Sequence, residues 1–151
     1  MGGRWGGGVH GCWWEEAYDR GFGERVYAET VHRASEVLAS GRPVLIDGCF
    51  RARAQRAAAQ DLAARFGTRF LFVEARITQK IQRARLTERA ARDSVSVAAW
   101  TEIAEEMRAT WEPAEEIAAE DYLALDTTRP LDQSADSIEA RLPAWPPQLK
   151  G

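Results

Sequence analysis

The chain has 151 residues, of which 45% are hydrophobic and 28% are charged, proportions that are ordinary for a globular domain with one hydrophobic core. No apolar run approaches the roughly 20 residues that cross a bilayer. The glycine-rich beginning also lacks the apolar stretch of a secretory signal. We therefore expect a cytoplasmic protein that does not associate with membranes.

The net charge of −3 conceals an uneven distribution along the chain. Residues 51–92 contain ten arginines and one lysine against three acidic residues, a local charge of +8, and the remaining residues together carry −11. A basic segment of this kind indicates a surface that faces an anion. The alternative is an exposed, arginine-rich helix surface that pairs with the acidic C-terminal third. The charges alone leave both interpretations open.

The spacing of apolar residues predicts alternating helices and strands between an irregular, glycine-rich segment at 1–17 and a tail at 143–151. In chain order, the predicted elements are a helix over 23–40, a strand over 43–47, a helix over 51–66, a strand over 70–74, helices over 77–91 and 97–111, a strand over 122–126 and a short helix from Ser134. The strands are continuous apolar runs, which is typical of parallel strands buried on both faces. The pattern predicts an α/β fold with a parallel sheet of about three strands and flanking helices.

Two residues are expected to set helix boundaries. Gly67 follows the helix over 51–66 and is suited to the left-handed backbone conformation that ends many helices. Ser96 precedes the helix over 97–111, where its hydroxyl can accept a hydrogen bond from an unpaired N–H group of the first turn.

Asp47 is a candidate metal ligand because it ends the first apolar strand. In open α/β sheets, ligands bind at the carboxyl ends of the strands. A carboxylate at that edge is suited to holding Mg²⁺ beside a nucleotide phosphate. The alternative is that Asp47 only caps the turn that follows the strand.

The helix over 77–91 and the residues just after it supply candidate anion ligands. Arg85, Arg89 and Arg92 are spaced by four and three residues, so they are expected to share one helix face. The planar guanidinium group can grip phosphate oxygens at two points. The alternative is an exposed helix whose arginines form salt bridges with Glu88 and Asp93.

Several short motifs in a fixed order resemble one known family over residues 18–142. They are Val26-Tyr27-Ala28, Gly41-Arg42-Pro43-Val44-Leu45-Ile46-Asp47, Phe50, Arg56, the strand Phe70–Glu74, Arg85-Leu86 with Arg89, Asp93 with Ser96 and Trp100, and Leu125-Asp126-Thr127-Thr128. Together they resemble the P-loop kinase-type ATPases related to zeta toxins and polynucleotide kinases. The resemblance implies part of a P-loop NTPase-like three-layer sandwich and, as ligands, ATP, Mg²⁺ and a phosphoryl acceptor of unknown identity.

The resemblance also implies roles for individual residues. It gives Asp47 a Walker-B-like role on the magnesium side and places Arg56 near the phosphoryl acceptor. It implies that Arg85, Arg89 and Arg92 belong to a lid that contacts the ATP phosphates, and that Thr127 and Thr128 flank the adenine.

The phosphate-binding loop of that family, Gly-x-x-x-x-Gly-Lys-Ser/Thr, does not occur in this sequence. The N-terminal glycines cannot replace it, because no lysine precedes Lys80 and no serine or threonine precedes Thr30. In the family, the strand of that loop lies between the two strands that correspond to 43–47 and 69–74. We therefore expect a fragment or a degenerate member of the family that is inactive as this chain, and one in which unpaired strands permit self-association.

Two other functions remain open from the sequence. The chain could be a non-catalytic binding or interaction domain that kept the scaffold, or it could bind nucleic acid weakly through the basic residues 51–92. The second alternative is disfavoured because the aromatic residues of that segment are expected in the core, where they cannot stack on bases.

Overall fold

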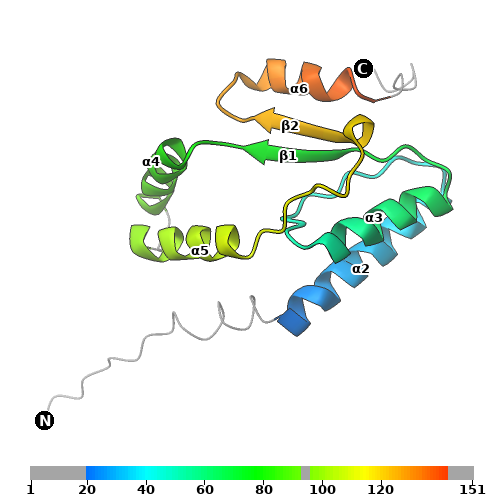
Figure 1. The fold of residues 1–151 in the computed structure, drawn as a ribbon, viewed down its shortest axis with the longest axis horizontal. Helices are drawn as coiled ribbons and strands as arrows, with labels where there is room; N and C mark the ends of the chain where they lie inside the picture. The colour runs from blue at the N-terminus through cyan, green and yellow to red at the C-terminus, as the bar shows by residue number, and fades with distance from the viewer. Residues whose placement is uncertain (1–19, 93–95, 143–151) are drawn as a thin grey trace, which may run out of the picture. The chain divides into compact units, whose positions relative to one another are not determined.

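The computed structural model describes residues 20–92 and 96–142 (Figure 1). The chain divides after Gly48 into two compact units, 1–48 and 49–151. The predicted irregular segment at 1–17 and the tail at 143–151 lie outside the described residues. Among the described helices, none combines the length and the apolar composition that a membrane crossing requires.

The first unit contains the helix α2 (Arg20–Ala39), close to the predicted helix over 23–40. Gly41 follows with a φ of 77°, a conformation that glycine adopts without steric cost, and its N–H donates to the Leu38 carbonyl. The chain then runs through residues 42–47 without regular secondary structure.

Residues 43–47 do not form a strand, so this prediction is wrong. No ladder hydrogen bond joins these residues to any other part of the chain that the structure describes, and Leu45 is 93% exposed. The physical reason is that an apolar run supplies the propensity for a strand, whereas a strand exists only when a neighbour accepts and donates its hydrogen bonds.

The second unit contains the remaining described elements. They are α3 (Arg53–Arg65), β1 (Phe72–Arg76), α4 (Gln79–Ala90), α5 (Val97–Ala109), the 3₁₀ turn η1 (Ala119–Asp121), β2 (Tyr122–Asp126) and α6 (Leu131–Glu139). The bounds of β2 agree with the prediction, and β1 begins two residues later than predicted. The predicted α/β class is confirmed, with a parallel sheet and flanking helices.

Local capping explains where several of these helices begin and end. Gly67 has a φ of 59° and completes a Schellman motif, in which its N–H donates to Ala64 and that of Thr68 donates to Ala63. The Ser96 hydroxyl accepts from the Ala99 N–H as predicted. By contrast, Ser134 does not begin the last helix, because its N–H already donates to the Pro130 carbonyl in the first turn of α6.

The sheet of the described residues has two parallel strands rather than the expected three or so. Its register pairs Phe72 with Tyr122 at one end and Arg76 with Asp126 at the other. The helix α6 packs against β2, and just after α6 the Arg141 guanidinium donates to the Tyr122 carbonyl over 3.1 Å. The helices α4 and α5 lie side by side beyond the carboxyl end of β1 (Figure 1).

Candidate functional site

The carboxyl ends of β1 and β2 are joined by hydrogen bonds of the two threonines that follow β2. The Thr127 N–H and hydroxyl both donate to the Arg76 carbonyl, over 3.1 and 3.3 Å. The Thr128 N–H and hydroxyl both donate to Asp126 Oδ1, over 2.9 and 2.7 Å. These two bonds lower the pKa of the Asp126 carboxyl, the backbone bond more than the side-chain bond. The edge where α/β sheets bind ligands is therefore ordered in this chain.

Arg85 reaches this edge from α4. Its Nη2 donates to the Thr127 carbonyl over 2.7 Å, and its Nη1 donates to the Thr127 hydroxyl over 3.3 Å. The helix that carries it is capped by Thr78, whose side chain accepts from the Ile81 N–H. The structure thus brings together two residues that the sequence proposed for one site from positions 42 residues apart.

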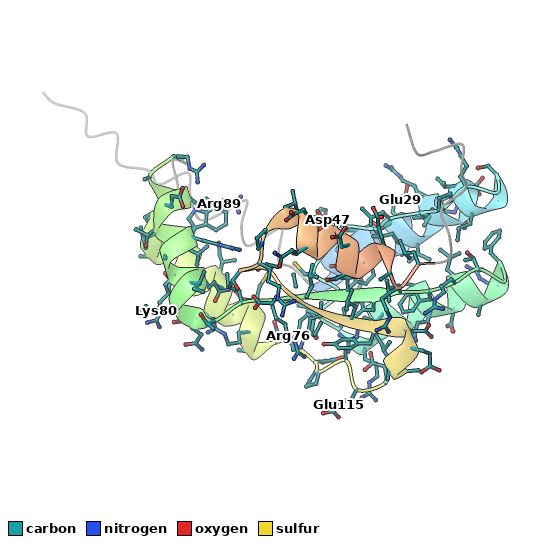
Figure 2. The ribbon with its side chains drawn as sticks, turned by 90° about the horizontal axis from the view of Figure 1, so that it is seen from above. Glu29, Asp47, Arg76, Lys80, Arg89 and Glu115 are labelled. Carbon is teal, nitrogen blue, oxygen red and sulfur yellow. The ribbon has the colours of Figure 1, made fainter. Side chains whose placement is uncertain are left out.

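Arg89 lies one turn further along α4 and stacks on α5. Its guanidinium carbon lies 4.2 Å from the centroid of the Trp100 ring, a distance at which a cation is attracted to the aromatic face. Arg108 of α5 donates to the Gln82 side chain over 2.7 Å, which joins the same two helices a second time. We call α4 and α5 the lid helices. Figure 2 labels Arg89 and Lys80 on α4 and Arg76 at the end of β1.

Arg92 lies just beyond the end of α4, and its predicted contact with a phosphate stays a prediction. The helix α4 ends at Ala90, so Arg92 lies in the turn beyond it. Its guanidinium pairs with the Glu88 carboxylate over 3.0 Å, and both side chains are 71% exposed. For Arg92, the structure shows the exposed salt bridge that the sequence offered as the alternative to a phosphate contact.

Arg56 is the largest fully buried side chain among the described residues. Its Nε donates to the Glu116 carboxylate over 2.6 Å, and its two terminal nitrogens donate to the carbonyls of Phe50, Arg51 and Pro113 over 2.9 to 3.2 Å. Phe50, itself buried, has a φ of 42°, which is strained for a residue with a side chain. A contact between Arg56 and a phosphoryl acceptor stays a prediction, and it would require some of these bonds to open.

Asp47 belongs to the first unit and is exposed. It makes no hydrogen bond or ion pair with the residues that the structure describes, and those residues contain no group of three His, Cys, Asp or Glu side chains that could hold a metal ion. One carboxylate fits Mg²⁺ only when phosphate oxygens and water supply the other ligands, which is how nucleotide-bound Mg²⁺ is usually held.

A polar cluster of Glu74, Arg76 and Tyr122 was not predicted from the sequence. Arg76 donates to both Glu74 oxygens, over 2.9 and 3.3 Å, and to the Tyr122 hydroxyl over 2.8 Å, and that hydroxyl donates to Glu74 over 2.5 Å. Burial raises the pKa of the Glu74 carboxyl, but the hydrogen bonds from Arg76 and Tyr122 and the neighbouring arginines lower it further, to below its ordinary value. Burial, followed by the bond to Glu74, raises the pKa of Tyr122. The alternation of side chains along a strand indicates that Glu74 and Arg76 share one face of the sheet. Placing Tyr122 beside them also required the register of β1 and β2.

The comparisons with known proteins give one match. A family model described as an AAA domain matches residues 15–114, which is 100 of the 151 residues. No curated protein and no solved structure matches the chain significantly. The matched range includes Asp47, Arg56 and the lid arginines and ends before β2, so it does not extend to Thr127 and Thr128.

Proposed function

The chain belongs to the AAA domain family, here a P-loop kinase-like nucleotide-binding domain, and from this we propose that it binds the phosphates of ATP at the carboxyl edge of β1 and β2. The observation that carries the proposal is the position of Arg85. A long, cationic side chain from the lid helices reaches the turn after β2, where its guanidinium lies on the Thr127 carbonyl and hydroxyl. A phosphate group can replace those two oxygens as the acceptor at the same two N–H groups.

Arg89 is the second cation of the proposed phosphate site. Arg89 lies one helical turn from Arg85 on the same side of α4, so a polyphosphate can bridge the two guanidinium groups. The family resemblance assigns Asp47 to a Mg²⁺ ion on the phosphate oxygens, a role that stays a prediction because Asp47 belongs to the first unit. Thr127 and Thr128 form the rim on which the base would lie.

We propose further that this chain does not turn ATP over by itself. In P-loop enzymes, the loop amides and the loop lysine supply most of the stabilisation of charge in the transition state. This sequence has no lysine before Lys80 and no Gly-x-x-x-x-Gly-Lys-Ser/Thr motif, so it lacks that contribution. Binding without turnover also agrees with the alternative of a non-catalytic binding domain, in which the lid arginines serve recognition alone.

The proposal is tested by titrating ATP into the protein with and without Mg²⁺ while amide chemical shifts are followed. We expect shifts confined to α4 and the turn after β2, tighter binding with Mg²⁺, and weaker binding as salt rises. Arg85→Ala and Arg89→Ala should each raise the dissociation constant about tenfold, which corresponds to one charge-assisted hydrogen bond.

Two matched controls separate a site from a general charge effect. Arg33→Ala removes the same charge from an exposed pair with Glu29 on α2, and Arg92→Ala removes it from the exposed pair with Glu88. Both should change the dissociation constant by less than about twofold. Equal losses in all four variants, or shifts indifferent to Mg²⁺ and spread over residues 51–92, would contradict the proposed site.

Nucleic-acid binding through residues 51–92 is a weaker proposal, because most basic side chains of that segment are already engaged within the protein. Arg56 is buried, Arg69 donates to the Glu120 carbonyl, and Arg76 pairs with Glu74. This alternative would be favoured if an oligonucleotide bound more tightly than ATP and each arginine variant weakened its binding by the same factor.

A further inference from the structure

The extended segment 43–47 has the properties of a strand without a partner. Its sequence is Pro-Val-Leu-Ile-Asp, and proline is tolerated at the first position of a strand because no ladder donor is needed there. No hydrogen bond joins these five residues to the rest of the described chain. Leu45 exposes 93% of its surface, the largest fraction among the exposed large hydrophobic residues of the described chain. Backbone groups and an apolar side chain are thus both presented for pairing.

The strand β1 has one open edge. The Arg76 carbonyl accepts from Thr127 on the β2 side, and alternate residues of a strand direct their N–H and C=O groups to opposite edges. Val73 and Ala75 therefore direct theirs away from β2. No described residue hydrogen-bonds to them there. Parallel sheets of only two strands are unusual because parallel strands are stable when both faces and both edges are covered.

Segment 43–47 and the open edge of β1 agree in length, pattern and charge. Each has five residues, and the segment repeats the pattern that β2 already presents to β1, which is apolar residues followed by an aspartate. In the register that β2 uses, Asp47 would lie beside Arg76. The Arg76 Nη1 group makes no hydrogen bond to a described residue, and the side chain is 61% exposed, so Nη1 can donate to this carboxylate. An antiparallel addition would instead place Asp47 beside Phe72, which offers it no charge.

From this complementarity we infer that two copies of the chain associate by exchanging segment 43–47. The segment of each copy adds as a third, parallel strand to the open edge of β1 in the other copy, with Asp47 beside the other copy's Arg76. The exchange is reciprocal, so it closes as a two-fold dimer in which neither copy has a segment 43–47 left to add to a further copy. It buries Leu45 and satisfies the groups of Val73 and Ala75. The inference does not depend on nucleotide binding.

The first test is the mass of the full chain by light scattering after size-exclusion chromatography, without nucleotide or Mg²⁺. We expect twice the chain mass of 16.8 kDa at the concentrations used for NMR. Leu45→Pro removes a donor from the middle of the segment and should raise the dimer dissociation constant at least about tenfold. Leu131→Pro is the matched control. Leu131 is 85% exposed and begins α6, where proline is tolerated, so this variant should stay dimeric.

The second test identifies the two surfaces. In chains with Cys12→Ser and Cys49→Ser, one batch carries Ile46→Cys and another carries Ala75→Cys, and the two are mixed with a short bismaleimide. We expect a cross-linked pair only from the mixture, and none when Leu45→Pro is added to the first batch. Asp47→Asn should weaken association roughly two- to fivefold and reduce its salt dependence. The inference would be overturned if the wild-type chain had the mass of a monomer or a mass above that of a dimer. It would also be overturned if Leu45→Pro left the association unchanged.

Discussion

Arginine has opposite surroundings in two parts of the second unit. Around Arg56, the guanidinium is fully buried and bonds to residues up to 60 positions away in sequence. On the lid helices and in the turn after α4, the arginines are exposed and lie against a tryptophan ring, a turn or a neighbouring carboxylate. A count of positive charges therefore does not locate an anion site. Burial decides whether an arginine holds the fold together or remains accessible to a ligand.

Removing the buried cation should have the largest effect on stability. Arg56→Ala removes the donor to the Glu116 carboxylate and to the carbonyls of Phe50 and Pro113, whereas the Arg51 carbonyl still accepts from the Glu112 N–H. We therefore expect the free energy of unfolding to fall by about 3–5 kcal/mol. Urea denaturation followed by circular dichroism measures it. Arg53→Ala is the control, because Arg53 reaches the same Glu116 over 3.6 Å with a 63% exposed side chain, and its loss should cost less than about 1 kcal/mol.

If Arg56→Ala fails to fold, Arg56→Lys keeps the charge and loses the fork of N–H groups. We expect it to fold, with a free energy of unfolding that is lower than that of the wild type and of Arg53→Ala but still above zero. A stability equal to that of the wild type would show that the hydrogen bonds to Phe50, Arg51 and Pro113 contribute little.

The cluster on the sheet is the next target. Tyr122→Phe removes one hydroxyl that donates to Glu74 and accepts from Arg76, and we expect a loss of about 1–2 kcal/mol in the free energy of unfolding. Combining it with Glu74→Gln gives a double-mutant cycle. A coupling energy close to zero would show that the two groups are satisfied independently.

Acid should destabilise the region around Glu116 and Glu74. The hydrogen bond from Arg56 lowers the pKa of Glu116 below its ordinary value of 4.5, and that of Glu74 is lowered as described above. A lowered pKa in the folded state contributes stability above the unfolded value, and this contribution is lost as pH falls through the folded value. The free energy of unfolding should therefore decline below about pH 4.5. Glu116→Gln should make the decline shallower, and an unchanged slope would refute this assignment.

The smallest effects on stability are expected at the exposed arginines. Arg85→Ala and Arg92→Ala should each change the free energy of unfolding by less than about 1 kcal/mol, because exposed pairs contribute little in water. Urea denaturation followed by circular dichroism also measures these changes. A loss at Arg85 as large as at Arg56 would mean that its contact with Thr127 is structural, and the contrast between the two regions would then disappear.

Local pattern was sufficient to predict part of the fold. Strand β2, the Gly67 helix end and the Ser96 cap follow from apolar runs and backbone chemistry within a few residues. The strand over 43–47 could not be decided in this way, because its existence depends on a partner elsewhere. The start of α6 was placed too late because Pro130, which precedes it, was assigned to the loop.

The positions of the candidate site residues could be predicted only where their spacing along one helix was sufficient. The helical spacing of Arg85 and Arg89 was sufficient to place both on α4. The burial of Arg56 was not visible, because its partners come from residues 113–116, and nothing near position 56 indicates them. The Glu74 cluster likewise required the pairing of Phe72 with Tyr122.

The bonds of Arg56 also have a consequence for the order of folding. They join residues 50–56 to residues 113–116 and so close a loop that contains α3, β1 and both lid helices. Closing so long a loop is slow, because chain entropy is lost before the contacts form. Once the loop is closed, the lid helices can open and reclose without breaking it. Amide hydrogens of α4 and α5 should then exchange with solvent through brief local openings, and those of α3 only when the whole unit unfolds.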